Sequence, residues 1–384
     1  MPNSTANAAD RKPSKPYRDF PLFPHANGLW AKKIKGDHKY FGKWDDPDAA
    51  LERYKAFVEG RSIGDPTIKE LVNAFLRFKE AALESGELSP RSFRDYHRTC
   101  THLVEFFGRA QVVEELRPED FGRYRKHLSK KFGLVSLTNE VNRSRIVFRY
   151  GVDAELLKRN PRYGKEFERP RKESVEREKL SKGPGLFSAA DLRQIIAAAE
   201  PTMQAMVLLA INCAYGQTDI AMLPKAAIDL SEGWATFPRP KTLVYRRCSL
   251  WKETVAALKT AIANRPKAAN RSDEGLAFLT KQGRPFVRTK RNDKDEIISI
   301  DTILPAFQKL LDTLDDVPRL GFYRIRHTHR TVSDGALDKG ASDVIMGHKD
   351  PSMAGNYVHG RDDHRLVTVS KHVHDWLYAK RKAK

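Results

Sequence analysis

Three residues that could act together on a phosphodiester follow one another near the C-terminal end of the sequence. Arg326 begins an Arg-His-Thr segment, His348 follows a glycine 22 residues later, and Tyr357 lies nine residues after that. A guanidinium can hold two non-bridging phosphate oxygens in a bidentate fork. An imidazole can add a hydrogen bond, and a phenol oxygen can attack phosphorus and become covalently joined to it. This order and spacing predict a site that attacks a phosphodiester.

The predicted nucleophile depends on its cationic neighbours. A phenol has a pKa near about 10, so nearby positive charge must favour the phenolate if Tyr357 is to react. Arg326 would neutralise the negative charge that builds on the non-bridging oxygens during attack. His348 would donate a hydrogen bond to the same phosphate. We therefore treat these three residues as the core of a candidate catalytic set.

Their order resembles the tyrosine recombinase family, which includes phage integrases and the Xer-type chromosome-dimer resolvases. In that family an Arg-His-Thr box leads to a Gly-His pair, here Gly347-His348, and then to the tyrosine, here followed by Val358-His359. The resemblance implies site-specific cleavage and rejoining of DNA through a 3′-phosphotyrosine intermediate. It also implies no metal and no cofactor, because the phosphotyrosine bond conserves the energy of the broken phosphodiester.

Lys241 lies in a segment, 239–242, that we expect to be a turn between strands at 234–237 and 244–250. This position resembles that of the family lysine that donates a proton to the leaving 5′ oxygen. General acid catalysis matters at this step because an alkoxide is a poor leaving group. The resemblance thus adds Lys241 to the catalytic candidates.

Two positions depart from the family pattern. The first family arginine falls at Gly216, with Gln217 beside it, and no arginine is present there. Three residues before Arg326 stands Tyr323, where the family usually has histidine or lysine. A phenol can still donate a hydrogen bond, so Tyr323 remains a catalytic candidate. The missing arginine, in contrast, removes a full positive charge from the expected phosphate pocket.

An active site would need another cation, because the lost charge contributes several kcal/mol of transition-state stabilisation. Four arginines are candidates for this role: Arg239, Arg246, Arg247 and Arg324. Of these, Arg324 and Arg247 are favoured because each is next in sequence to a predicted site element. The alternative is a degenerate recombinase that binds DNA without cleaving it.

Composition agrees with a nucleic-acid partner. The 384 residues carry a formal net charge of +20, which favours nucleic acid first and an anionic membrane surface second. No apolar run of about 18 residues occurs, and the polar N-terminus lacks the apolar core of a signal peptide. We expect a cytoplasmic, nucleoid-associated prokaryotic protein without membrane contact. The three cysteines, Cys100, Cys213 and Cys248, are far apart and are expected to be reduced.

The length predicts several domains, mainly α-helical with small β-sheets. Residues 1–62 contain a flexible arm, two short strands at 29–35 and 38–44, and a helix beginning at Asp46. They resemble the arm-type DNA-binding domains of some phage integrases; a solvated basic hairpin is the alternative. The candidate DNA contacts are Lys32, Lys33, Lys35 and Lys39.

Residues 65–168 carry four helix signals: a capping box at Thr67 and Glu70, a Ser89-Pro90 start, an Arg117-Pro118 start and an apolar stretch from Ser136. Four helices in this length resemble the family's core-binding domain. Its candidate phosphate contacts are Arg91, Arg94, Arg98, Arg143 and Arg145.

Residues 169–185 are charged and rich in helix breakers, so we expect a linker. Residues 186–384 form the expected mixed α+β catalytic domain. Its last helix carries apolar residues at helical spacing: Leu366, Val369, Val373, Trp376 and Leu377. That helix either packs on its own domain or, as the resemblance implies, is an exchange helix that docks on a neighbouring protomer.

The resemblance implies double-stranded DNA as the partner, a homotetramer assembled on two duplexes, and possible accessory DNA-bending proteins. A type IB topoisomerase uses similar chemistry as a monomer and is a further alternative. The expected arm-type domain and exchange helix favour the recombinase over the topoisomerase.

Overall fold

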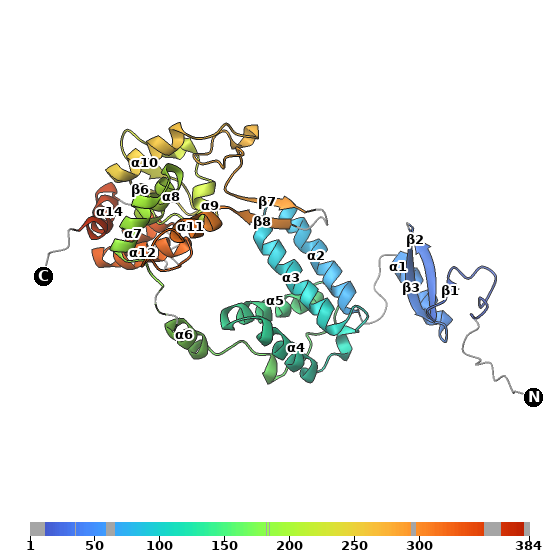
Figure 1. The fold of residues 1–384 in the computed structure, drawn as a ribbon. Coiled ribbons are helices and arrows are strands. Elements are labelled where there is room, and N and C mark those ends of the chain that lie inside the picture. The colour runs from blue at the N-terminus through green and yellow to red at the C-terminus, as the bar shows by residue number, and fades with distance from the viewer. Residues whose placement is uncertain are drawn as a thin grey trace, which may run out of the picture. The chain divides into compact units, whose positions relative to one another are not determined.

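The computed structural model of the chain (Figure 1) describes residues 12–34, 36–58, 66–181, 183, 185–292, 297–348 and 362–379. The chain divides into two compact units, residues 1–176 and 177–384. Helices dominate both units, and the strands of the described ranges form small antiparallel sheets. The mainly helical fold with small sheets is therefore confirmed. None of the helices in these ranges is both long and apolar enough to cross a membrane.

The first unit begins with a three-stranded sheet in the order β1-β2-β3. The strands are β1 (Phe23–His25), β2 (Leu29–Ile34) and β3 (Asp37–Lys43), and α1 (Pro47–Val58) follows. The two predicted strands are present, whereas β1 is an addition. Asp46 begins α1 as predicted, because its Oδ1 accepts the Ala49 amide at 2.9 Å. The small core consists of Phe20, Leu22, Trp30, Phe41 and Ala50.

The four helices predicted for residues 65–168 are all present. They are α2 (Ile68–Glu84), α3 (Pro90–Phe107), α4 (Pro118–Lys131) and α5 (Leu134–Asp153). The Thr67 amide donates to Glu70 Oε2 at 2.9 Å, and the Glu70 amide donates to Thr67 Oγ1 at 3.3 Å, so the capping box is confirmed. Ser89 Oγ accepts the Ser92 amide at 3.2 Å. Buried Leu71, Phe75, Leu103, Phe121 and Phe148 belong to one core beneath these helices.

A buried carboxylate on α5 ties this core to α3. Glu140 accepts from Thr99 Oγ1 at 2.8 Å, from Arg98 Nη2 at 3.0 Å and from Arg143 Nη1 at 3.2 Å. Burial by itself would raise the pKa of Glu140. Interactions with His102, Thr99 and Arg98 outweigh burial and lower the pKa to about 2.

Glu140→Gln is expected to lower the free energy of unfolding of the helical region by about 2 kcal/mol at neutral pH, because charge-assisted bonds are lost. A carboxyl whose pKa is lower when folded contributes stability above its unfolded pKa of 4.5. That contribution disappears as pH falls towards 2, so the difference between variant and wild type should vanish there. Hydrogen exchange of backbone amides in α3 and α5, followed across a urea titration, measures this difference in the free energy of unfolding. Glu105→Gln, on the exposed side of α3, is the control; an equal loss in both variants would contradict the prediction.

The predicted linker, 169–185, is partly helical. It contains α6 (Lys172–Ser181), which buries none of its residues. The boundary between the two compact units falls within this helix, after Glu176. Charge and helix breakers thus predicted an exposed connection, but they did not predict the helix in it.

The second unit is built around α8 (Pro201–Asn212), whose residues from Ala205 onward are buried. Around it lie α7 (Ala189–Ala198), α10 (Lys252–Ala263), α12 (Tyr323–Ser333) and α14 (Asp363–Tyr378). The described residues of this unit also form α9 (Gln217–Ala221), α11 (Ile303–Leu311) and α13 (Lys339–Met346). One sheet joins β4 (Ile228–Asp229), β5 (Trp234–Thr236) and β6 (Arg247–Ser249), and a hairpin joins β7 (Val287–Arg291) to β8 (Ile297–Asp301). This unit has the predicted mixed α+β composition.

Helix α14 packs within its own unit. Its residues Leu366, Val369, Val373 and Leu377 are fully buried in the core around α8. The Trp251 indole donates to Ser370 Oγ at 2.9 Å and fixes the helix further. Of the two alternatives for this helix, the structure favours packing on its own domain over an exchange helix, because its apolar stripe is already covered. Residues 380–384 lie outside the described ranges.

Candidate active site

The Arg-His-Thr segment lies in the middle of α12, where the helical repeat sends its three side chains in different directions. Arg326 is only 2% exposed, whereas His327 is exposed. Thr328 is buried, and its Oγ1 accepts the Phe187 amide at 3.1 Å. The segment therefore places a guanidinium inside the unit and fastens α12 to the beginning of the same domain.

Arg326 joins three separate segments. Its Nη1 donates to the Ala214 carbonyl, just beyond α8, and its Nη2 donates to the Met346 carbonyl at 2.8 Å, at the end of α13. The same Nη2 lies 3.1 Å from His348 Nε2. Burial lowers the pKa of Arg326, and nearby cations act in the same direction, while Tyr323 opposes them. The two residues predicted to bind one phosphate are thus in direct contact.

His348 is oriented by this contact. A guanidinium can only donate, so Nε2 of His348 is the acceptor, and its proton is assigned to Nδ1. Nδ1 lies 3.5 Å from Asp343 Oδ1 on α13. Burial and then Arg326 lower the pKa of His348, whereas Asp343 raises it. The imidazole is therefore neutral near pH 7. The sequence pattern had not singled out Asp343, because a helical carboxylate near a histidine is common.

Gly347 ends α13 with a left-handed backbone, φ 62°, and two arginines pack against it. A Cβ atom placed there would lie 3.0 Å from Arg239 Cβ and 3.4 Å from Arg246 Cδ. The glycine is thus required both by its backbone conformation and by the space that these arginines occupy.

Gly347→Ala is expected to lower the rate of DNA cleavage by about 10²-fold, because a shift of His348 and Arg239 on the order of 1 Å misplaces the phosphate contacts. Single-turnover formation of a covalent protein–DNA complex measures this effect. Gly275→Ala is the matched control, since a Cβ there meets nothing within 4 Å. A Gly347→Ala protein as fast as the control would show that this packing does not position the site.

Gly216 and Tyr323, the two positions that differ from the family pattern, lie next to one another. A Cβ atom on Gly216 would lie 2.9 Å from Cε2 of Tyr323. Asp219 Oδ2 accepts the Gly216 amide at 2.8 Å and lies 3.2 Å from Arg246 Nη1. The position that lacks arginine is therefore covered by the Tyr323 ring and bordered by an Asp219–Arg246 ion pair. Tyr323 itself is 41% exposed, which leaves its phenol accessible.

The four candidate arginines have different surroundings. Arg246 is fully buried, with its guanidinium 3.9 Å from the centroid of the Tyr215 ring. Arg247 is bound by both carboxylate oxygens of Asp363 at 2.8 Å. Arg324 is exposed beside Gly185. The sequence favoured Arg247 and Arg324, but the structure holds the first in a bidentate ion pair and leaves the second on the surface.

Lys241 lies in the predicted turn between β5 and β6. The Arg239 carbonyl accepts the amides of Thr242 at 3.1 Å and Leu243 at 2.8 Å, and the Arg239 amide donates to the Val244 carbonyl at 2.9 Å. Lys241 is exposed, and no described residue binds its ammonium. Arg239, two residues earlier, contacts Gly347, so the turn begins at the site. Tyr357, the predicted nucleophile, lies outside the described residues.

The lysines predicted to contact DNA from the first sheet lie on both of its faces. Lys32 is opposite Lys39 in the register, and its ammonium is 5.8 Å from the centroid of the Tyr54 ring on α1. Neighbouring residues on a strand point to opposite faces, so Lys33 points away from the helix. Lys35 lies outside the described residues. These lysines cannot all enter one groove from a single face.

Three of the arginines predicted to contact phosphates in the helical region have internal partners. The five candidates are Arg91, Arg94, Arg98, Arg143 and Arg145. Arg98 and Arg143 bind Glu140, and Arg145 donates to the Phe167 carbonyl at 2.6 Å. For the first two candidates, no side-chain partner occurs among the described residues. A sequence pattern could not separate these groups, because the partners, buried Glu140 and the Phe167 carbonyl, are distant in sequence.

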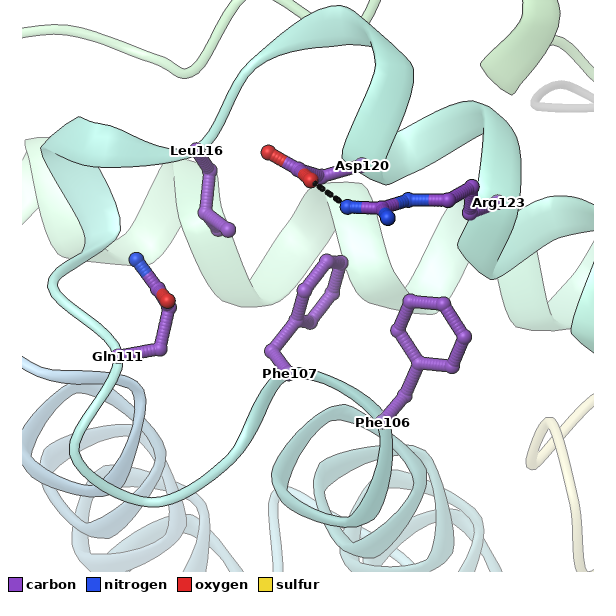
Figure 2. A pocket seen from close by; sticks show the side chains of 6 residues that line it. All are labelled: Phe106, Phe107, Gln111, Leu116, Asp120 and Arg123. Carbon is purple, nitrogen blue, oxygen red and sulfur yellow. Dashed lines mark hydrogen bonds and ion pairs between the residues drawn. The ribbon is translucent and has the colours of Figure 1, made fainter.

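A pocket in the first unit lies between the end of α3 and the start of α4 (Figure 2). It is lined by Phe106, Phe107, Gln111, Leu116, Asp120 and Arg123. Arg123 is paired with Asp120 at its rim. None of the predicted catalytic residues belongs to it. Within the described ranges, no three His, Cys, Asp or Glu side chains are grouped so that they could hold a metal ion.

The sequence profile of the phage integrase family matches residues 186–364. These residues belong to the phage integrase family. The integrase domain therefore begins where the predicted catalytic domain begins, and it includes the Arg326–His348 pair and Tyr357. The resemblance to tyrosine recombinases is confirmed.

Similarity of fold to solved structures extends beyond the integrase domain. The chain is similar to a lambda integrase dimer bound to a COC′ core site, with a TM-score of 0.54, 14% identity, and coverage of 91% of this chain and 97% of that chain. It is also similar to the Tn1549 transposon integrase in complex with transposon right end DNA, with a TM-score of 0.56, 12% identity, and coverage of 80% and 99%. A lambda integrase tetramer bound to a Holliday junction gives a TM-score of 0.53, 14% identity, and coverage of 87% and 96%. The chain matches no curated protein sequence.

Proposed function

We propose that this protein is a site-specific recombinase that cleaves and rejoins DNA strands through a 3′-phosphotyrosine intermediate. The observation that carries the proposal is the contact between Arg326 Nη2 and His348 Nε2 at 3.1 Å within the integrase domain. A buried guanidinium can bind the non-bridging oxygens of a phosphate, and the adjacent imidazole can donate to the same phosphate once it carries a proton on Nε2.

The proposed chemical step uses Tyr357 and Lys241 in addition to this pair. The Tyr357 oxygen attacks phosphorus, and the bond to the 5′ oxygen breaks. The phenol proton passes to solvent, and Lys241 gives a proton to the leaving oxygen and then regains one from solvent, so the step consumes no net proton. Attack by a 5′ hydroxyl on the phosphotyrosine reverses it and rejoins a strand. A phosphate oxygen that accepts from Arg326 Nη2 would also release His348 Nε2 from its present contact.

The partner in this proposal is double-stranded DNA, bound by a homotetramer. The formal charge of +20 favours a polyanion. The similarity to a lambda integrase tetramer on a Holliday junction supports an assembly on two duplexes. Residues 1–62 would bind arm-type sites, Arg91 and Arg94 would contact phosphates of the core site, and DNA-bending proteins would assist.

A covalent trap tests the proposal. Duplexes with a randomised centre and a nick at varied offsets are incubated with the protein, denatured and separated by gel. A nick close to the cleaved bond lets the short fragment diffuse away, so the phosphotyrosine accumulates. We expect a covalent band whose recovered DNA has a common sequence. Binding of the same library without any covalent band would contradict the proposal.

That contrary result defines a second candidate function, a DNA-binding protein that no longer cleaves. Gly216 favours it, because the first family arginine is absent there. Such a protein would enrich a sequence from the library by binding while leaving every strand intact.

A further inference from the structure

The phosphate pocket requires more cationic groups than Arg326 alone. Charge develops on two non-bridging oxygens during attack, and Gly216 offers no side chain to them. A replacement must lie beside Arg326 and His348, and its guanidinium must be free of other partners. It must also be accessible to DNA.

Arg239 meets these conditions. Its backbone is fixed by hydrogen bonds of the β5–β6 turn, with its amide on Val244 and its carbonyl on Thr242 and Leu243. Its side chain lies against Gly347, the residue before His348. Arg239 is half-buried, and no described residue forms a hydrogen bond or ion pair with its guanidinium.

The other three arginines fail at least one condition. Arg246 has no exposed surface, and Asp219 already offsets its charge at 3.2 Å. Arg247 is engaged by Asp363. Arg324 points to the surface near Gly185, on the side where the chain enters the domain.

We propose that Arg239 is a catalytic residue that supplies the second guanidinium of the phosphate pocket, in place of the arginine missing at Gly216. This inference rests on the proposed function and adds a residue that reaches the site from a different element. Electrostatics agree with the geometry, because the Arg239 charge lowers the pKa of both Arg326 and His348. An anionic phosphate between the three groups would relieve this repulsion.

The test compares two scissile linkages in the trapped target site. One is the natural phosphodiester, and the other is a methylphosphonate, in which a methyl group replaces one charged oxygen. On the phosphodiester, Arg239→Ala should slow covalent complex formation by about 10²-fold to 10³-fold, and Arg239→Lys by about tenfold because it keeps charge but loses the fork. On the methylphosphonate, the Arg239→Ala defect should shrink to less than about tenfold, because there is less charge to stabilise.

Arg247→Ala is the matched control, since it removes the same charge from the same hairpin. It should show no difference between the two linkages. Thermal melting of each variant checks folding. A loss in Arg239→Ala that is equal on both linkages, or no loss at all while wild type cleaves, overturns this inference and leaves the proposed function intact. Failure of wild type to form a covalent complex on either linkage overturns both.

Discussion

Tyr357→Phe is expected to abolish the covalent protein–DNA complex while leaving DNA affinity within about twofold of wild type. Only the phenolic oxygen is removed, so the nucleophile is lost while contacts made by the ring and by the basic surface remain. The covalent product should fall by at least about 10⁴-fold, as expected when a nucleophile is deleted. Denaturing gels with a nicked duplex measure the product, and gel shifts with the intact duplex measure affinity.

Tyr378→Phe provides the matched control for this experiment. Tyr378 is the last residue of α14 and packs near Trp251, so the change removes a phenolic oxygen outside the proposed site. The control should form the covalent complex at the wild-type rate. A covalent band that survives in Tyr357→Phe would exclude this tyrosine as the nucleophile.

Arg326→Lys is expected to lower the cleavage rate by about 10²-fold to 10³-fold. A lysine ammonium cannot reproduce the planar fork that donates to Ala214, to Met346 and to a phosphate at once. Because two buried carbonyls lose a donor, the free energy of unfolding should also fall by about 1–3 kcal/mol. Single-turnover cleavage and thermal melting are measured on the same preparations.

Arg319→Lys is the control, because Arg319 is half-exposed and pairs only loosely with Asp312 at 3.5 Å. Arg319→Lys should change neither the cleavage rate nor the free energy of unfolding appreciably. If Arg326→Lys loses stability but cleaves at the wild-type rate, Arg326 is structural and the phosphate is bound by other groups.

The elements that could be predicted are those specified by local sequence. Thr67 with Glu70 and Ser188 with Asp191 form capping boxes, and the helices that they begin start where expected. Strand β1 was missed because three residues, one of them Pro24, show no alternation. The helix in the linker was missed because α6 has no apolar face to signal it.

At the site, the order of residues predicted which side chains meet, but not what surrounds them. The Arg326–His348 contact follows from a spacing that the family shares. Arg247 forms an ion pair with Asp363, which lies 116 positions later in the sequence. No local sequence pattern predicts such a pair. The same holds for Arg98 and Arg143, whose roles depend on Glu140 being buried.

The contact between Gly216 and Tyr323 limits how the family arginine could be introduced into this chain. A Cβ atom at Gly216 would lie 2.9 Å from Cε2 of the Tyr323 ring, so a single change of Gly216 to arginine begins with a clash. The ring must first turn outward or be replaced by a smaller residue. Gly216→Arg is therefore accommodated more readily when Tyr323 is also replaced by a smaller residue than when it is made alone.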